Sequence, residues 1–143
     1  MSEHLIRIFP NLAASTWRTT SPEDATYNCI AWALGETGRW WWPDPFGLYY
    51  WPTNAPREAT LKAMREVLEA AGYAACADGV LEVRMEKIAV YVHQGVLSHA
   101  ARQTAAGTWT SKLGYLEDIE HQPHAIAGSD YGDVALYMKR RRK

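Results

Sequence analysis

The composition of this 143-residue chain, with 48% hydrophobic residues and a formal net charge of −1, is that of a single globular domain. The near-zero charge gives no electrostatic case for a nucleic-acid partner. No apolar run approaches the roughly 20 residues that span a bilayer, and the first residues lack the apolar core of a signal peptide. We therefore expect a cytoplasmic protein without a membrane partner.

Cysteine usage and the basic C-terminus set further expectations. Neither Cys29 nor Cys76 has a second cysteine at a metal-ligand spacing, and two cysteines do not make a disulfide framework. We therefore expect free thiols, no metal site and no cofactor. One domain is expected over 1–143, with a flexible basic tail at 139–143.

The N-terminal part of the chain leads to a cysteine at a predicted helix start. The apolar stretch 5–9 predicts an edge strand or an extended arm, and 11–26 predict a loop because they are rich in Ser, Thr, Pro and Asp. Asn28 is a good N-cap residue, since its side-chain oxygen can accept from a free amide of the first turn. Cys29 would then begin a helix that ends near Gly35.

The segment 39–52, RWWWPDPFGLYYWP, concentrates aromatic rings among prolines. The prolines exclude a regular helix or a central strand. We expect an irregular loop whose rings pack back onto the domain. Two interpretations stay open, because the rings either pad a small core or line a cleft that contacts a ligand.

The rest of the chain predicts one clear helix followed by strands. Apolar residues recur at three- and four-residue spacing over 56–71, which predicts a helix with one buried face. Turns at Gln94–Gly95 and Ala106–Gly107 separate three β-rich segments, which predict an antiparallel meander. Because helices precede strands, the predicted fold class is α+β. The expected strands are 87–92, 96–103, 108–112 and 132–138, and the expected short helices are 116–121 and 124–127.

Cys29 is the candidate nucleophile. A thiol at the positive end of a helix dipole is favoured as thiolate, the reactive form, and it also needs an adjacent base. Among the five histidines His99 is the best placed, because small residues flank it in a predicted strand, and His121 is the runner-up. The alternative interpretation is structural, with Cys29 as a small buried residue and His99 as a hydrogen-bonded strand histidine.

The order of these residues resembles the papain-like cysteine hydrolase superfamily. A cysteine at a helix start is followed by His99-Ala100 in a strand, and the next strand carries Trp109 and Lys112. In papain-type enzymes a His-Ala pair begins a strand, and the next strand has the pattern W-x-x-K-N-S-W-G, whose Asn orients the histidine. In the NlpC-type members the histidine begins a strand similar to H-V-G-I-Y, and Lys87 holds that position here.

The papain-like resemblance implies a fold and leaves the third catalytic residue open. It implies a cysteine-bearing N-terminal helix packed on an antiparallel β-meander. Leu113 stands where the orienting Asn is found. Either Ser111 or Asp118 orients the histidine instead, or a Cys-His dyad works without a third member, or the site is inactive.

A second resemblance covers most of the chain. The patterns Y-N-C-I-A-W-A, W-W-W-P, H-A-A-R-Q and W-T-S-K-L-G together are similar to a family of uncharacterised bacterial proteins of about this size. This resemblance implies no activity. Its patterns fall on Cys29, the tryptophan run, His99 and Lys112.

The papain-like resemblance implies a hydrolase or acyltransferase that acts on an amide, such as a peptidase, amidase or deamidase, with a peptide or protein as substrate or partner. Cys29 would attack the carbonyl, and His99 would hold the thiolate as an ion pair and protonate the leaving amine. Asn28 and a backbone amide would form the oxyanion hole. The residues expected to contact the substrate are Trp40, Trp41, Trp42, Tyr50, Trp51, Arg102 and Lys112.

The alternative function is a non-catalytic binding or immunity-type module. Its Trp/Tyr-rich loop would recognise a peptide or a sugar ring by stacking, as exposed aromatic residues suit. One geometric observation separates the two functions: in a hydrolase the thiol of Cys29 should lie within about 4 Å of a ring nitrogen of His99. The strand register decides this, because a shift of one residue sends the side chain to the other face of its sheet.

Overall fold

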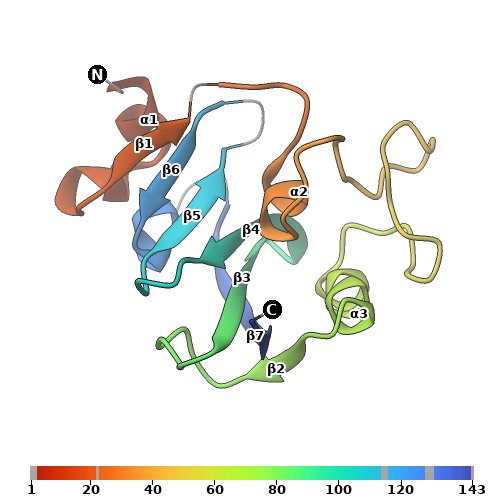
Figure 1. Ribbon diagram of the computed structural model, residues 1–143. Helices are drawn as coiled ribbons and strands as arrows, with labels where there is room; N and C mark the ends of the chain where they lie inside the picture. The colour runs from red at the N-terminus through yellow and green to blue at the C-terminus, as the bar shows by residue number, and fades with distance from the viewer. Residues whose placement is uncertain (1–2, 22, 114–115, 128–130, 143) are drawn as a thin grey trace.

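The computed structural model describes residues 3–21, 23–113, 116–127 and 131–142, and a seven-stranded sheet forms its centre (Figure 1). The strand order is β1-β6-β5-β4-β3-β7-β2, and every neighbouring pair is antiparallel. The strands are β1 (Arg18–Ser21), β2 (Ala74–Cys76), β3 (Met85–His93), β4 (Val96–Gln103), β5 (Trp109–Lys112), β6 (Asp118–His121) and β7 (Asp133–Arg141). The helical segments are α1 (Glu3–Ile8), η1 (Pro10–Ala14), α2 (Cys29–Ala33), α3 (Leu61–Ala70) and η2 (Pro123–Ile126).

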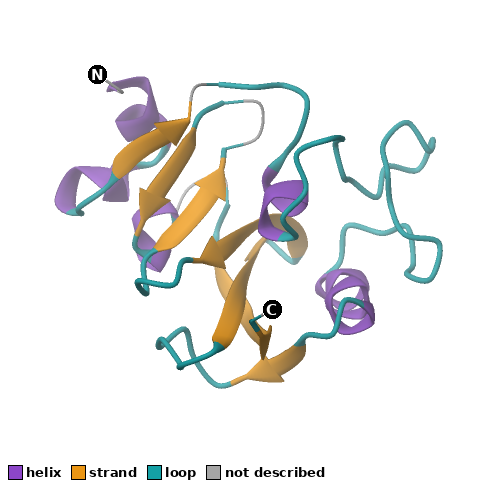
Figure 2. Cartoon of the chain, in the orientation of Figure 1, coloured by secondary structure: helices purple, strands orange, loops and turns teal. Residues whose placement is uncertain are grey.

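The predicted papain-like α+β fold is wrong. The chain forms mostly an antiparallel seven-stranded sheet with a few short helices, and no N-terminal cysteine helix forms a layer on it (Figure 2). The cysteine segment α2 has five residues and follows α1, η1 and β1 in the chain. It stops early because Gly35 takes a left-handed conformation, with φ of 79°, two residues after Ala33.

The predicted strands of the second half are confirmed within a few residues. Gln94 and Gly95 make the β3–β4 turn with positive φ values of 51° and 80°, as the Gln-Gly pair predicts. The helix predicted from Pro56 begins later, because Thr60 caps α3 and its hydroxyl accepts from the amide of Ala63 at 3.1 Å.

Several predictions near the sheet edges are wrong. The stretch 5–9 lies mainly in helix α1, and the predicted loop 11–26 contains the edge strand β1. The segment 116–121, predicted as a short helix, contains strand β6, because pairing with β1 and β5 on its two sides outweighs local preference. Residues 139–141 of the expected basic tail belong to β7.

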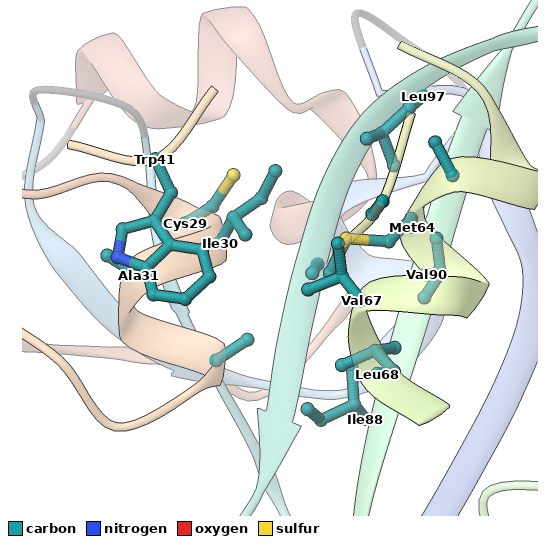
Figure 3. Packing of buried hydrophobic residues seen from close by; sticks show 14 of the residues in the cluster. Cys29, Ile30, Ala31, Trp41, Met64, Val67, Leu68, Ile88, Val90 and Leu97 are labelled. Carbon is teal, nitrogen blue, oxygen red and sulfur yellow. The ribbon is translucent and has the colours of Figure 1, made fainter. Parts of the chain in front are cut away.

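The sheet separates two hydrophobic cores. The cysteine face, which packs against α2, α3 and the loop around Trp41, has Cys29, Met64 and Ala100 in its core. Figure 3 shows Cys29 beside Trp41, with Met64 of α3 across the same core. The histidine face, which packs against α1, η1 and η2, has Tyr91 and Trp109 in its core.

None of the helices in the described ranges has both the length and the apolar character needed to cross a membrane; α3, for example, has ten residues.

Candidate functional site

Asn28 joins the start of α2 to the aromatic loop. Its side-chain oxygen accepts from the amide of Ala31 at 3.3 Å, which makes it the predicted N-cap. The same oxygen accepts from the amide of Trp41 at 3.1 Å, and the side-chain nitrogen donates to the carbonyl of Trp41 at 2.6 Å. Both ends of this amide are therefore engaged within the chain, and its donor points to Trp41 instead of an oxyanion.

The aromatic loop closes on itself beside Cys29. The amide of Trp42 donates to the carbonyl of Tyr50, and the amide of Tyr50 donates to the carbonyl of Trp40, both at 3.0 Å. In Figure 1 the loop extends beyond α2, away from the sheet. It forms one wall of a pocket of about 340 Å³, which we call the aromatic pocket. The lining residues are Asn28, Cys29, Trp40, Trp42, Tyr49, Ser98 and Tyr131.

The aromatic residues predicted to contact a substrate divide into two groups. Trp40 and Trp42 line the aromatic pocket. Trp41, Tyr50 and Trp51 pack into the core of the cysteine face instead. Trp41 meets Tyr50 edge-on with 4.5 Å between ring centroids, and the indole of Trp51 donates to a backbone carbonyl. Some rings of the tryptophan run therefore pad the core and others line the pocket, while contact with a ligand stays a prediction.

The two cations predicted to orient a substrate do not line the pocket. The guanidinium of Arg102 lies over the ring of Trp32, 4.5 Å from its centroid. Lys112 is buried, and its ammonium donates to the carbonyl of Asp24 and lies 5.0 Å from the ring centroid of Tyr27. Burial lowers the pKa of Lys112, although nearby carboxylates oppose this.

Cys29 lies at the floor of the aromatic pocket with only 5% of its surface exposed. Burial raises the pKa of its thiol to about 11. Hydrogen bonds from backbone amides, including that of Ala100, and the charge of Lys112 lower the pKa by less than burial raises it. A raised pKa does not favour the predicted activated thiol, because a five-residue helix supplies a weak dipole and the thiol is withdrawn from water.

His99 faces away from Cys29. It pairs across the sheet with Tyr91, whose side chain lies in the core of the histidine face, whereas the next residue, Ala100, packs in the core that contains Cys29. The imidazole stacks on Tyr131 with 4.0 Å between centroids and is fully buried. The predicted Cys-His dyad is not assembled in this structure. This orientation follows the regular alternation of β4 from His99 to Ala101, and the register shift between Tyr91 and Val92 lies on the other side of His99, at Ser98.

His99 belongs instead to a buried chain of hydrogen bonds, the His–Ser–His chain. The Nδ1 of His121 is 2.7 Å from the carbonyl of Gln122 and must donate to it, so Nε2 of His121 accepts. The hydroxyl of Ser111 therefore donates to that Nε2 at 2.6 Å and accepts from Nε2 of His99 at 2.8 Å. Nδ1 of His99 has no hydrogen-bond partner among the described residues.

Burial holds both histidines of this chain neutral near pH 7. It lowers the pKa of His121 to about 4 and that of His99 well below its usual value. A neutral His99 cannot hold a thiolate as an ion pair. Burial, more than any charge, therefore sets the protonation of the thiol and of its predicted base.

The two candidates for the third catalytic residue lie on opposite faces. Ser111 contacts His99, as one prediction required. Asp118 lies on the cysteine face, where its cross-strand neighbour is Lys112 and its carboxylate accepts from the hydroxyl of Tyr27 at 2.9 Å. Burial raises the pKa of Asp118. Asp118 therefore has no part in orienting His99.

The sequence analysis missed three residues of the aromatic pocket. Tyr49 adjoins the predicted aromatic contacts, so its position in the aromatic run was a usable signal. Ser98 is the residue before His99, and its orientation depends on the register shift that begins there. Tyr131 comes from a distant turn and has no local signal. Across the described residues, no group of three or more His, Cys, Asp or Glu side chains gathers as a metal site.

Comparison with known proteins assigns the chain to a family but indicates no activity for it. Residues 18–139 match a family described as a domain of unknown function, DUF7689. No curated protein and no solved structure matches the chain. These comparisons give no support to the papain-like resemblance. The match spans most of the sequence, and the chain belongs to the DUF7689 family.

Proposed function

We propose that the protein is a non-catalytic binding module that holds an uncharged ring in the aromatic pocket. The observation that carries this proposal is the make-up of the pocket wall. Trp40, Trp42, Tyr49 and Tyr131 surround about 340 Å³, and no charged side chain is found among the described residues that line it. A few polar groups among apolar walls are typical of small-ligand sites.

Ring stacking is the interaction that this wall favours. Aromatic pairs contribute about 0.5–1.5 kcal/mol beyond the area they bury. A charged ligand would lose hydration without gaining a partner, which is costly. Polar contacts come from the hydroxyl of Ser98, which donates to the carbonyl of Tyr131 at 2.6 Å and keeps its own oxygen available as an acceptor.

The cysteine-hydrolase hypothesis finds less support in this geometry. A thiol nucleophile needs a lowered pKa and an adjacent base. Cys29 has a raised pKa, and the predicted base, His99, is oriented toward the other core. The thiol is better placed as part of an apolar pocket floor, the common environment of a buried free cysteine.

Titration with two uncharged ring compounds tests the proposal. N-acetyl-tryptophanamide and methyl β-glucopyranoside are added to 15N-labelled protein, and amide shifts are followed by NMR. At least one probe should bind saturably and shift amides around 40–49. Trp42→Ala should weaken that binding about two- to tenfold, since it removes one stacking wall.

Trp17→Ala is the matched control, because Trp17 is a half-buried tryptophan that lines a different pocket, beside Arg18 and His121. It should leave the affinity unchanged. The proposal is wrong if neither probe shifts amides around 40–49, or if Trp17→Ala removes binding while Trp42→Ala does not.

A further inference from the structure

The aromatic loop ends in an exposed apolar tip next to the aromatic pocket. Phe46 is 84% exposed and Leu48 is 75% exposed. Single exposed apolar residues are ordinary, but these two flank Gly47 in a segment that leads directly to Tyr49 of the pocket wall. We call the segment 44–49 the apolar tip.

Hydrogen bonds to one carboxylate hold the apolar tip in place. Asp44 accepts from the amides of Leu48 at 2.8 Å and Tyr49 at 3.0 Å, and its own carbonyl accepts from the amide of Gly47. Gly47 has φ of 70°, which favours glycine at this turn. The exposed side chains are therefore presented on an ordered backbone.

Arg57 braces the same turn from the segment before α3. Its guanidinium donates to the carbonyl of Asp44 at 3.1 Å and to the carboxylate of Asp44 at 3.2 Å. Burial would raise the pKa of Asp44, but hydrogen bonds from the backbone amides of the tip and the charge of Arg57 together hold it below its usual value. The carboxylate of Asp44 therefore stays ionised at neutral pH and keeps its hydrogen bonds to the turn. Such ordering before contact reduces the entropy lost on binding.

The apolar tip and the aromatic pocket share a wall. Tyr49 belongs to the tip and also lines the pocket, where its ring pairs with that of Trp40 at 6.0 Å between centroids. Leu48 directly precedes Tyr49 in the chain, so the apolar tip begins one residue from the pocket wall. Pocket and tip together present two adjacent apolar subsites.

We propose that these two subsites dock a polypeptide segment, with a ring side chain in the aromatic pocket and a second apolar side chain against Phe46 and Leu48. This proposal rests on the proposed function and names its partner class. Contact with Phe46 and Leu48 removes apolar surface from water, and apolar peptide side chains offer the matching surface.

A sugar chain fits the apolar tip less well. Sugar hydroxyls need hydrogen-bond partners when they lose water. The side chains of Phe46 and Leu48 offer none, and the amides of Gly47, Leu48 and Tyr49 already donate to Asp44. At Phe46 and Leu48 the tip therefore offers no side-chain or amide donor to the hydroxyl groups of a sugar chain that leaves the pocket.

Three probes test the docking surface by NMR titration: N-acetyl-tryptophanamide, N-acetyl-Trp-Leu-Leu-amide and N-acetyl-Trp-Ser-Ser-amide. The leucine peptide should bind about three- to tenfold more tightly than the serine peptide, because only the leucine peptide has apolar side chains to bury on the tip. The double variant F46S/L48S should remove this difference while leaving the affinity for N-acetyl-tryptophanamide unchanged. Val83→Ser is the matched control, because Val83 is 87% exposed on a different loop, and it should keep the difference.

The outcomes separate the two proposals. Equal affinity for the two peptides, or a difference that survives in F46S/L48S, overturns the docking surface even when the single ring binds. Tighter binding of the pocket to methyl β-glucopyranoside than to either peptide overturns the choice of a polypeptide. Absence of binding by every ring probe overturns the proposed function itself.

Discussion

Both faces of the sheet bury hydrogen-bonded polar groups, among them Lys112 and Asp118 on the cysteine face, but they differ in that the aromatic pocket borders Cys29. On the histidine face, His99, Ser111 and His121 are buried and joined into one directional chain of hydrogen bonds. On the cysteine face, the thiol of Cys29 borders a pocket that the aromatic loop leaves open. The polar groups of the histidine face are therefore internal to the fold, while the pocket on the cysteine face is where we propose that a ligand binds.

This difference follows from the alternation of strands. Neighbouring residues of β4 point to opposite faces, so Ala100 contacts the cysteine core while His99 contacts Tyr91 and Tyr131. Residues that are adjacent in the sequence of a strand therefore contribute to different cores. The comparison predicts that substitutions on the histidine face reduce stability, and that those on the pocket wall reduce binding.

The largest expected effect is on stability and concerns two tryptophans. Trp109→Ala should lower the free energy of unfolding by about 3–5 kcal/mol, because Trp109 is almost fully buried on the histidine face. Trp42→Ala should cost clearly less, since its ring borders the open pocket. Urea denaturation of both variants measures the difference. Equal losses would contradict the division of the two faces.

The next effect concerns the His–Ser–His chain. Ser111→Ala should cost about 2–3 kcal/mol, because it leaves a buried donor on His99 and a buried acceptor on His121 without partners. Ser98→Ala is the matched control and should cost about 1 kcal/mol or less, since it removes one hydrogen bond near the pocket. Similar losses in the two variants would show that the chain does not stabilise the fold.

Acid should weaken the fold through the same chain. The pKa of His121 is lowered from 6.5 to about 4 in the folded protein, so the unfolded chain binds more protons between these values. Stability is therefore fully present above pH 6.5 and falls as the pH drops toward 4. His99 acts in the same direction, whereas the raised pKa of Asp118 acts in the opposite one.

His121→Gln isolates this contribution. Between pH 7.5 and 5 the wild type should lose about 1–2 kcal/mol more than the variant does, measured by urea denaturation at each pH. The comparison cancels the contributions of Asp118 and of other groups that both proteins share. Parallel pH profiles for the two proteins would refute the assignment to His121.

Local features of the fold were predictable from the sequence where a few neighbouring residues decide the backbone conformation. Asn28 caps α2, and the Gln94–Gly95 turn joins β3 to β4, because side-chain capping and left-handed turns are decided within a few residues. The aromatic loop was also predictable, since its prolines exclude regular structure. Trp40 and Trp42, predicted to contact a substrate, line the pocket beside Cys29, and the contact itself stays a prediction.

The predictions that failed concern features that depend on contacts between distant segments of the chain. β6 is a strand because β1 and β5 pair with it, and nothing within 118–121 indicates this. The face of His99 depends on which alternate residues of β4 point to each core, and this follows from the pairing of β4 with β3 and not from the local sequence. The raised pKa of Cys29 was not predictable either, because burial, which has no local signature, outweighs the helix dipole.

The pH dependence of Cys29 alkylation by iodoacetamide tests the central claim, that the pocket binds without thiol chemistry. The measurement uses Cys76→Ser protein, because Cys76 is the other free thiol. The structure predicts slow alkylation through neutral pH, with a rate that rises only toward the thiol pKa of about 11 and is unchanged by His99→Gln. A free cysteine has a pKa of about 8.5. Rapid alkylation at a pH well below that value, together with its loss in His99→Gln, would contradict the claim.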